Sequence, residues 1–187
     1  MPIAEVVTER LALSVPASAD VPELHQLYAD PRVWRDDPIS RHINSGQTEH
    51  LVRRWQAGWD RVGFGFWVAR STLPHSTGQL VGIGGCSLRY GMAWNLGYRL
   101  SPPFWRQGYA QEIIAEALAT ADRLHPELPM TAYLVEGNTR SQRAAERAGL
   151  HRIWRGPDAG NPDPDAVRLL YADRTLPPKV VGRLTAE

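Results

Sequence analysis

The stretch from Trp105 to Glu112, WRQGYAQE, has the residue types and the spacing of an anion-binding loop. It follows a strand-like run and opens a long helical pattern, so it would present free backbone N–H groups at a helix N-terminus. Those groups and the positive end of the helix dipole attract a phosphate, and Arg106 adds a full positive charge beside them. Gly108 and Ala110 keep bulky side chains away from an approaching ligand. We therefore predict a phosphate-binding loop in this stretch.

Other phosphate and metal chemistries do not fit the same sequence. The loop lacks the Lys-Ser or Lys-Thr ending of a P-loop, and it does not carry the three spaced glycines of a dinucleotide-binding turn. The six histidines show no metal-ligand spacing, so we predict no metal site. The single cysteine, Cys86, excludes an internal disulfide bond and falls in a predicted buried strand, where we expect it to serve packing.

Charge and hydropathy limit the partners of the chain. Its 21 Lys and Arg residues nearly balance its 20 Asp and Glu residues, which gives a formal net charge of +1. We therefore expect no nucleic-acid partner, and any anion site must be local. No run approaches the ~20 apolar residues that span a bilayer, and the start, MPIAEVVTER, lacks the layout of a signal peptide. We expect one domain of ordinary size, in the cytoplasm and off the membrane.

The elements that must hold the loop begin with a strand and two helices. Residues 10–15 alternate between apolar and polar side chains, which predicts a strand. An apolar stripe follows Asp20, which we expect to cap a helix, with Glu23 three residues further on as in a capping box. A second helical pattern starts at Thr48 and ends at Gly63, which we expect to be its C-terminal cap.

Between these helices, residues 33–46 are rich in charged, aromatic and turn-forming residues and show no clear period, so we predict a loop. Functional groups often lie on loops that a rigid scaffold holds in place. Four of its side chains are candidates for binding an acceptor substrate: Trp34, Asp36, Asp37 and His42. A solvated connection is the alternative interpretation for each of them.

Three short strand patterns with brief links, at residues 64–70, 79–88 and 94–100, predict an antiparallel meander. Three glycines in the middle pattern indicate a bulge or the close approach of another backbone. They are Gly82, Gly84 and Gly85.

After the phosphate-binding loop, the chain shows two helical and three strand-like patterns. They are a helix that ends near residue 124, a strand over 130–136, a short helix over 138–148 closed by Gly149, and strands over 150–154 and 167–173. The order of all the patterns predicts a mixed α+β fold. No structure is predicted for the segment beyond Asp173.

Three motifs carry a resemblance to a known family. They are TERLAL near Thr8, GYRLSPPFWRQGYAQE from Gly97, and EGNTRSQRAAERAGL from Glu136. Together with the predicted order of elements, they resemble the Gcn5-related N-acetyltransferases (GNAT), and within them the branch that acetylates the N-termini of ribosomal proteins. The resemblance implies a mixed, mainly antiparallel sheet flanked by helices, with a splayed central pair of strands. It spans residues 1–173 as a single domain and leaves residues 174–187 as a C-terminal tail.

The resemblance implies transfer of an acetyl group from acetyl coenzyme A (acetyl-CoA) to an amine. The central strand would offer backbone groups to the pantetheine arm, the glycine loop would hold the pyrophosphate, and Asn138 would contact the cofactor near its thioester. The implied cofactor-binding residues are Tyr98, Arg99, Leu100, Arg106, Gln107, Gly108, Tyr109, Ala110, Gln111 and Asn138. The short helix adds three arginines that either meet cofactor phosphates or form an exposed basic face: Arg140, Arg143 and Arg147. Members of the family are often dimers, so a homodimer is a further implication.

The sequence departs from the family at two catalytic positions. Many relatives carry a tyrosine that acts as the acid for the departing thiolate, but Ala145 stands at that position. Some members of the N-terminal branch use a serine three residues after the asparagine, so Ser141 is the natural substitute. The glutamate that some relatives use as a base is replaced by Tyr133.

An amine must be neutral to attack a thioester, so a nearby base would assist the reaction. Glu136 and Glu112 are candidates, and His42 is a weaker one; a cap or a surface charge is the alternative role for each glutamate. An α-amino group, with a pKa of about 8, needs less help from a base than a lysine with a pKa near 10.4. The lack of an obvious base therefore favours an α-amine or another weakly basic acceptor.

We expect an enzyme that transfers acetyl directly to a primary amine, first of all the N-terminal α-amine of a protein or peptide. Small amines such as amino acids, polyamines and aminoglycoside-like compounds are the alternative acceptors. The rival from another class is a module that binds acyl-CoA without catalysis, because the tyrosine and the glutamate of many relatives are missing.

Overall fold

The computed structural model describes residues 5–159 and 161–186. The strands are β1 (Glu5–Val7), β2 (Leu11–Ser14), β3 (Phe66–Ser71), β4 (Leu80–Arg89), β5 (Ala93–Leu100), β6 (Met130–Val135), β7 (His151–Pro157) and β8 (Val167–Ala172). The α-helices are α1 (Val21–Ala29), α2 (Ser45–Val62), α3 (Tyr109–Leu124), α4 (Thr139–Arg147) and α5 (Pro178–Leu184). The strands form one sheet in the order β1-β2-β3-β4-β5-β6-β8-β7. Among the described strands only β5 and β6 pair in parallel, which confirms the predicted mixed, mainly antiparallel sheet.

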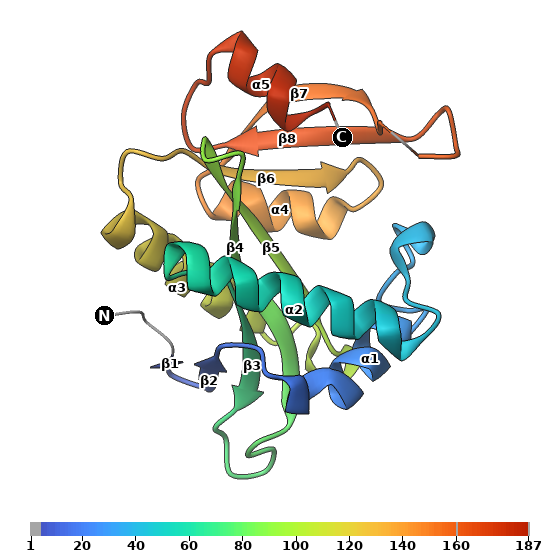
Figure 1. Ribbon diagram of the computed structural model, residues 1–187, viewed down its shortest axis with the longest axis vertical. Coiled ribbons are helices and arrows are strands. Elements are labelled where there is room, and N and C mark those ends of the chain that lie inside the picture. Colours follow the sequence, from blue (N-terminus) through green and yellow to red (C-terminus); the bar gives the residue numbers. More distant parts are fainter. Residues whose placement is uncertain (1–4, 160, 187) are drawn as a thin grey trace.

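Helices cover both faces of this sheet (Figure 1). On one face, α1 and α2 pack on Val68 and Ile83, because these apolar side chains leave the central strands on the same side. On the other face, Ile113 of α3 packs with Trp67, the neighbour of Val68 in β3. The two faces of one strand therefore bury their side chains in two separate hydrophobic clusters.

The central strands β5 and β6 separate soon after they meet. Their parallel register contains two pairs, Trp94 with Met130 and Asn95 with Thr131. Beyond Asn95 the backbone of β5 has no strand partner on the β6 side, although β5 continues to Leu100. This divergence confirms the expected splayed pair, and it opens a gap in the middle of the sheet.

The glycines of β4 lie where neighbouring backbones come close, as predicted. A Cβ atom on Gly82 would lie 2.2 Å from the carbonyl oxygen of Arg99, and one on Gly85 would lie 2.3 Å from that of Gly65. The register between β3 and β4 also shifts next to Gly82, as in a β-bulge. Only glycine therefore fits at these two positions.

The predicted capping box at the start of α1 is wrong. The carboxylate of Asp20 accepts a hydrogen bond from the backbone N–H of Ala17 at 2.8 Å, and it makes no side-chain cap on α1. Asp20 and Glu23 both bind the guanidinium of Arg70 on β3, at 2.8 and 2.5 Å. The two carboxylates that the local sequence assigns to the N-terminus of α1 therefore bind an arginine that is distant in the sequence.

Helix α2 begins three residues earlier than predicted. Asn44 caps it by accepting a hydrogen bond from the N–H of Gln47 at 3.1 Å, and the side chain of Gln47 accepts one from the N–H of Asn44 at 3.3 Å. Its predicted end at Gly63 is confirmed, because Gly63 adopts the left-handed conformation with φ 68°.

Two elements have no counterpart among the predicted ones. Strand β1 pairs with β2 at the edge of the sheet, and α5 follows β8. Leu176 and Leu184 bury their side chains against Ala93 and Leu170, so the segment beyond Asp173 contributes to the apolar interior. Within the described ranges, no helix is both long and apolar enough to cross a membrane.

Candidate active site

The loop before α3 has a strained, well-supported backbone. Arg106 and Gly108 have positive φ angles of 61° and 85°, and the left-handed conformation is unfavourable for an arginine. Two side chains of the loop return to the preceding backbone: the indole N–H of Trp105 donates to Leu100 O at 2.8 Å, and the amide of Gln107 donates to Pro103 O at 2.7 Å. The backbone before the loop therefore holds the side chains of Trp105 and Gln107 in place.

A latch of Thr8, Arg10 and Glu112 ties this loop to the edge of the sheet. The Glu112 carboxylate accepts hydrogen bonds from the Thr8 hydroxyl at 2.5 Å and from the backbone N–H and Nε of Arg10 at 2.8 Å. Arg10 also donates to Gln107 O at 2.8 Å and lies over the ring of Tyr109, 4.4 Å from its centroid. The motif TERLAL thus supports the loop from a distant part of the chain.

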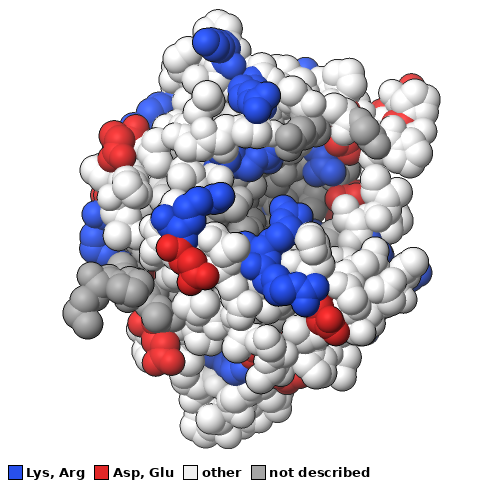
Figure 2. All heavy atoms as spheres, viewed as in Figure 1, with Lys and Arg blue, Asp and Glu red and all other residues white. Residues whose placement is uncertain are grey.

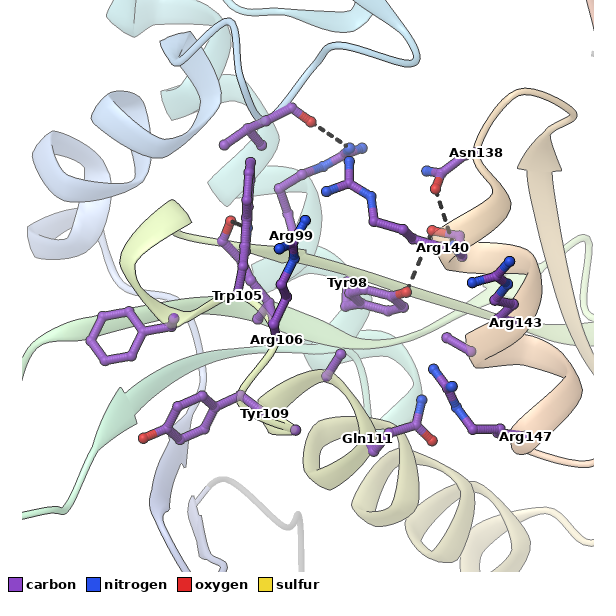
Figure 3. A pocket seen from close by; sticks show the side chains of 17 residues that line it. Tyr98, Arg99, Trp105, Arg106, Tyr109, Gln111, Asn138, Arg140, Arg143 and Arg147 are labelled. Carbon is purple, nitrogen blue, oxygen red and sulfur yellow. Dashed lines mark hydrogen bonds between the residues drawn. The ribbon is translucent and has the colours of Figure 1, made fainter.

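A first cavity, of about 320 Å³, opens beside this loop and is drawn in Figure 3. None of its described lining residues is an Asp or a Glu, and its arginines come from β5, the loop and α4. They are Arg99, Arg106, Arg140, Arg143 and Arg147. Of these, Arg140 makes an ion pair with Asp36 at 3.3 Å. The cavity therefore carries a strong positive charge that suits a ligand with several negative groups.

The N-terminus of α3 faces the first cavity. The N–H groups of Tyr109 and Ala110 lie in the first turn, where a helix leaves them without backbone partners, whereas those of Gln111 and Glu112 donate to Gly108 O at 3.0 and 3.2 Å. The side chain of Gln111 lines the cavity, and its buried amide nitrogen has no partner among the described residues. An anion in the cavity would accept hydrogen bonds from the N–H groups of Tyr109 and Ala110 and from the side-chain amide of Gln111.

Nearly all the predicted cofactor-binding residues meet at this cavity. Tyr98, Arg99 and Leu100 line it from β5, and Asn138 lines it from the start of α4. The loop contributes every predicted position except Gln107, whose side chain binds the backbone at Pro103 instead.

Two hydroxyl groups meet where β5 faces α4. The Ser141 Oγ lies 3.4 Å from the Tyr98 hydroxyl, and both residues line the first cavity (Figure 3). The side chain of Asn138 caps α4 by accepting a hydrogen bond from the N–H of Ser141 at 3.0 Å. The cap fixes the first turn of α4 and with it the position of Ser141. The hydroxyl of Tyr98 is a functional group that the sequence does not reveal, because only the fold brings it to Ser141.

Arg99 connects the first cavity to the predicted acceptor loop. Its guanidinium lies over the buried Trp34 ring, 3.7 Å from the centroid, and donates to Val33 O at 3.3 Å. Burial lowers its pKa from the ordinary value, although Tyr28, Asp37, Tyr98 and Asp36 oppose this shift. Trp34 therefore packs beneath an arginine.

The candidate bases lie away from the first cavity. Glu136 makes an ion pair with Arg155 at 2.6 Å, and the hydrogen bonds from that guanidinium lower the pKa of its carboxyl. Glu112 belongs to the latch. Burial alone would raise its pKa, but hydrogen bonds from Thr8 and Arg10 lower it below the usual range. His42 binds the Thr48 hydroxyl at 2.8 Å and packs on Tyr28, and burial lowers its pKa.

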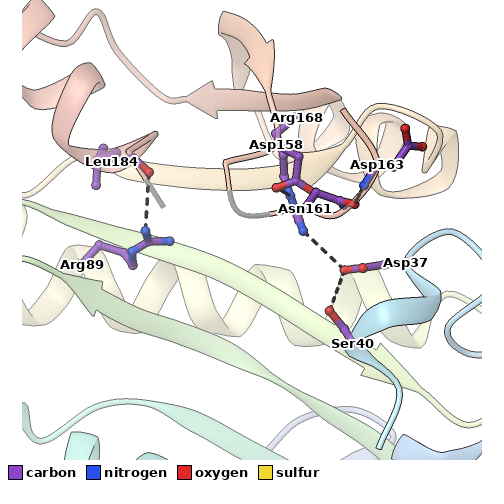
Figure 4. Close-up of polar contacts among 8 residues, drawn as sticks. All are labelled: Asp37, Ser40, Arg89, Asp158, Asn161, Asp163, Arg168 and Leu184. Atoms are coloured by element: carbon purple, nitrogen blue, oxygen red, sulfur yellow. Dashed lines mark hydrogen bonds and ion pairs between the residues drawn. The ribbon is translucent and has the colours of Figure 1, made fainter. Parts of the chain in front are cut away.

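A second cavity, of about 430 Å³, lies on the opposite face of the sheet, beside α2. Its lining residues are Ile39, Arg54, Ser87, Arg89, Tyr133, Asp158, Ala159, Asn161 and Arg168. On the face that carries α2, Figure 2 shows a hollow with Lys and Arg side chains around it. Inside, Arg168 joins Asp158 at 2.8 Å to Asp37 at 3.5 Å, and Asp37 accepts from Ser40 at 3.0 Å (Figure 4). The predicted acceptor loop thus forms one wall of the second cavity.

A third cavity, of about 440 Å³, shares Ile39 and Asn161 with the second one. Five carboxylates line it: Asp36, Asp37, Glu136, Asp163 and Asp165. Asp36 and Asp37 therefore lie on the wall of a cavity, whereas Trp34 and His42 line none of the three cavities. Within the described ranges, no group of three or more His, Cys, Asp and Glu residues is arranged to hold a metal ion.

Comparisons with known proteins identify the family. The family model described as an acetyltransferase (GNAT) domain matches residues 10–151. The chain therefore belongs to the GNAT acetyltransferases. The uncharacterized protein YkkB of Bacillus subtilis (strain 168) is 24% identical to it over 168 residues, which are 83% of this chain and 92% of that protein.

Solved structures share the fold over most of the chain. An acetyltransferase from Agrobacterium tumefaciens strain C58 is similar with a TM-score of 0.72 and 25% identity, over 94% of this chain and 96% of that one. RimL, a ribosomal L7/L12 α-N-protein acetyltransferase in complex with coenzyme A, is similar with a TM-score of 0.69 and 19% identity, over 89% and 95% of the two chains. These likenesses confirm the predicted GNAT-type fold.

Proposed function

We propose that this chain binds acetyl-CoA in the first cavity and transfers the acetyl group directly to a primary amine. The observation that carries the proposal is the set of five arginines in a cavity at the N-terminus of α3, where the described lining residues include no carboxylate. Coenzyme A carries its negative charges on a pyrophosphate and a 3′-phosphate, which such a cavity matches. The partnerless amide nitrogen of Gln111 supports the same fit.

The gap between β5 and β6 provides the second part of the fit. Because pairing with β6 stops at Asn95, backbone groups over residues 96–100 can bind an extended amide-containing arm as a further strand would. Tyr98, Arg99 and Leu100 would hold the pantetheine there, with Asn138 near the thioester.

Ser141 and Tyr98 are the groups of this chain that can supply a proton at the gap. Acetyl-CoA, when bound, supplies an acetyl group on a sulfur that leaves as a thiolate. The Ser141 hydroxyl would protonate this sulfur, and Tyr98, 3.4 Å away, would supply or share the proton. No residue of the chain is acetylated in this mechanism, because the amine attacks directly.

The first choice of acceptor is the α-amine of a protein or peptide. The two glutamates that could serve as bases are both held by arginines, Glu136 by Arg155 and Glu112 by Arg10. An acceptor whose amine has a pKa of about 8 needs the least assistance. The related RimL, an α-N-protein acetyltransferase, supports this choice. Small-molecule amines are the second candidate, because the second and third cavities are concave enough to enclose one.

A binding and turnover experiment tests the proposal. Gly108→Asp should weaken coenzyme A binding by at least tenfold, because the new carboxylate would lie where the pyrophosphate is proposed to bind. Gly78→Asp, in an open position with a similar φ of 78° and outside the three cavities, is the control. Thiol release with a panel of peptides and small amines then measures transfer. Tight binding of acetyl-CoA without turnover of any amine would favour a non-catalytic acyl-CoA sensor, and unchanged affinity of Gly108→Asp would overturn the placement of the pyrophosphate.

A further inference from the structure

The side chain of Tyr133 leaves β6 on the face opposite to α4. In the register of β6 with β8, Ala132 faces Tyr171, whose hydroxyl reaches Gln142 and Glu146 of α4 at 3.3 Å. Because successive side chains of a strand point to opposite faces, Tyr133 points away from α4. It lines the second cavity together with residues of α2 and β4.

The hydroxyl of Tyr133 is buried and has no hydrogen-bond partner among the described residues. Buried polar atoms are almost always paired, because an unpaired one carries a large desolvation penalty. An unpaired hydroxyl that lines a cavity is therefore a group available to a ligand. Burial raises the pKa of Tyr133, while Arg168 and Arg89 oppose this shift and Asp158 adds to it. The phenol is thus neutral near pH 7 and can both accept and donate a hydrogen bond.

Tyr133 lies at the point where the sheet opens. Thr131 is the last residue of β6 that pairs with β5, and Tyr133 follows two positions later, about 7 Å along the strand. On the α4 side of the same gap lie the hydroxyls of Tyr98 and Ser141. The gap that we assign to the thioester therefore has a hydroxyl pair on the α4 side and the unpaired phenol on the α2 side.

We propose that Tyr133 is a catalytic residue whose hydroxyl oxygen accepts a hydrogen bond from the attacking amine in the second cavity. The inference rests on the proposed function and deepens it, because it assigns the acceptor's amine a partner. The neutral amine forms the C–N bond with its lone pair, and the C–S bond breaks with its electron pair on sulfur. The nitrogen loses one proton to water, the sulfur gains one from Ser141, Ser141 regains one from water, and Tyr133 keeps its own. The products are an N-acetylated amine and the free thiol.

The substitution Tyr133→Phe separates this role from a structural one. Phenylalanine keeps the ring that packs near Trp154, and it removes a hydroxyl that makes no hydrogen bond within the described part of the chain. The variant should therefore fold with an unchanged or higher melting temperature. We expect its kcat/KM for amines to fall about 10- to 100-fold, with an unchanged Kd for acetyl-CoA.

Tyr171→Phe is the matched control. Its hydroxyl also comes from the β6–β8 ladder, but it points to α4 and has partners there. This variant should lose stability and keep its turnover per folded molecule. Loss of turnover in Tyr133→Phe alone, with loss of stability in Tyr171→Phe alone, would show that the lower turnover comes from the hydroxyl in the second cavity.

A binding measurement tests the contact without turnover. The probe is a bisubstrate analogue in which the sulfur of coenzyme A is joined through an acetyl bridge to an amine. Tyr133→Phe should weaken the analogue about tenfold and leave coenzyme A unchanged, as measured by calorimetry. Equal affinity of the wild-type protein and the variant for the analogue, with wild-type turnover, would overturn the proposal. If the wild-type protein binds acetyl-CoA but acetylates no amine, the proposed function fails. The ratio of the affinities of the wild-type protein and Tyr133→Phe for the bisubstrate analogue still decides whether Tyr133 contacts the amine.

Discussion

Two hydroxyls in the first cavity, those of Ser141 and Tyr98, are the groups that we propose as proton donors to the leaving sulfur. Ser141 is predicted from the resemblance to the N-terminal branch of the family, and its place in the cavity depends on the helix cap that Asn138 provides. The hydroxyl of Tyr98 lies beside Ser141 because β5 faces α4, and no local sequence pattern predicts this contact. A sequence motif can thus name one member of a proposed catalytic pair and miss the other.

At the residue scale, we predict that Ser141→Ala lowers kcat about 100-fold, because general acid catalysis contributes on that order. The Kd for acetyl-CoA should stay within about twofold, since the serine makes no charged contact with the phosphates. Thiol release and calorimetry measure the two quantities. Thr139→Ala, an exposed position in the same helical turn, should behave as wild type. Wild-type turnover of Ser141→Ala would remove this serine from the mechanism.

At the scale of elements, the predicted phosphate-binding loop is held by contacts distant in sequence. The latch joins the edge of the sheet to the first turn of α3, more than a hundred residues later, and it supports the strained backbone of Arg106. The local pattern of WRQGYAQE predicts the loop, the helix and the free N–H groups. It cannot predict that Glu112 is the anchor, because the partners of that carboxylate lie in TERLAL.

Glu112→Gln is expected to weaken the latch and the loop together. Loss of the charge-assisted hydrogen bonds should cost about 2 kcal/mol of unfolding free energy at pH 7 and weaken coenzyme A binding several-fold. The folded-state pKa of Glu112 is lowered, so its contribution to stability is present above the unfolded pKa and is lost as the pH falls through the folded pKa. Denaturation curves between pH 7 and pH 3 should therefore converge for the two proteins. A constant difference down to pH 3 would contradict the assignment.

The glycines of the fold give a second prediction at this scale. Gly82→Ala would place its Cβ 2.2 Å from Arg99 O, and we expect a loss of roughly 3 kcal/mol in the free energy of unfolding because backbone must move. At Gly58, inside α2, an added Cβ would have no neighbouring atom within 4 Å. Gly58→Ala should therefore stabilise the protein by about 1 kcal/mol. Urea titrations of both variants measure this contrast, and destabilisation by Gly58→Ala would argue against the helix packing described above.

At the scale of the whole molecule, the sequence predicts most of the elements and the first cavity, but not the relation between the cavities. Periodicity identifies the meander and the helices because each depends on its own residues. The predicted capping box of Asp20 and Glu23 is wrong because Arg70, on a separate strand, binds both carboxylates. The second cavity depends on side chains from α2, β4, β6 and β8, so no stretch of the chain contains its pattern.

The charge of the first cavity leads to a prediction for the whole protein. Coenzyme A at 100 times its Kd should stabilise the folded state by about 2.7 kcal/mol, and so raise the melting temperature by roughly 5–10 °C. Partly exposed arginines are screened by salt, so this shift should shrink between about 0.05 and about 1 M NaCl, where the Debye length falls to about 3 Å. Thermal unfolding at matched coenzyme A concentrations measures both effects.

A pair of double variants assigns that salt dependence to the first cavity. Arg143→Gln with Arg147→Gln should reduce both the thermal shift and its sensitivity to salt, because neither arginine has an ion-pair partner in the described part of the chain and both line the cavity. Arg41→Gln with Arg61→Gln removes the same charge from exposed positions outside the three cavities and should leave both quantities unchanged. Equal losses in the two double variants would mean that coenzyme A responds to the net charge of the protein, and the arginines of α4 would then be an ordinary basic face.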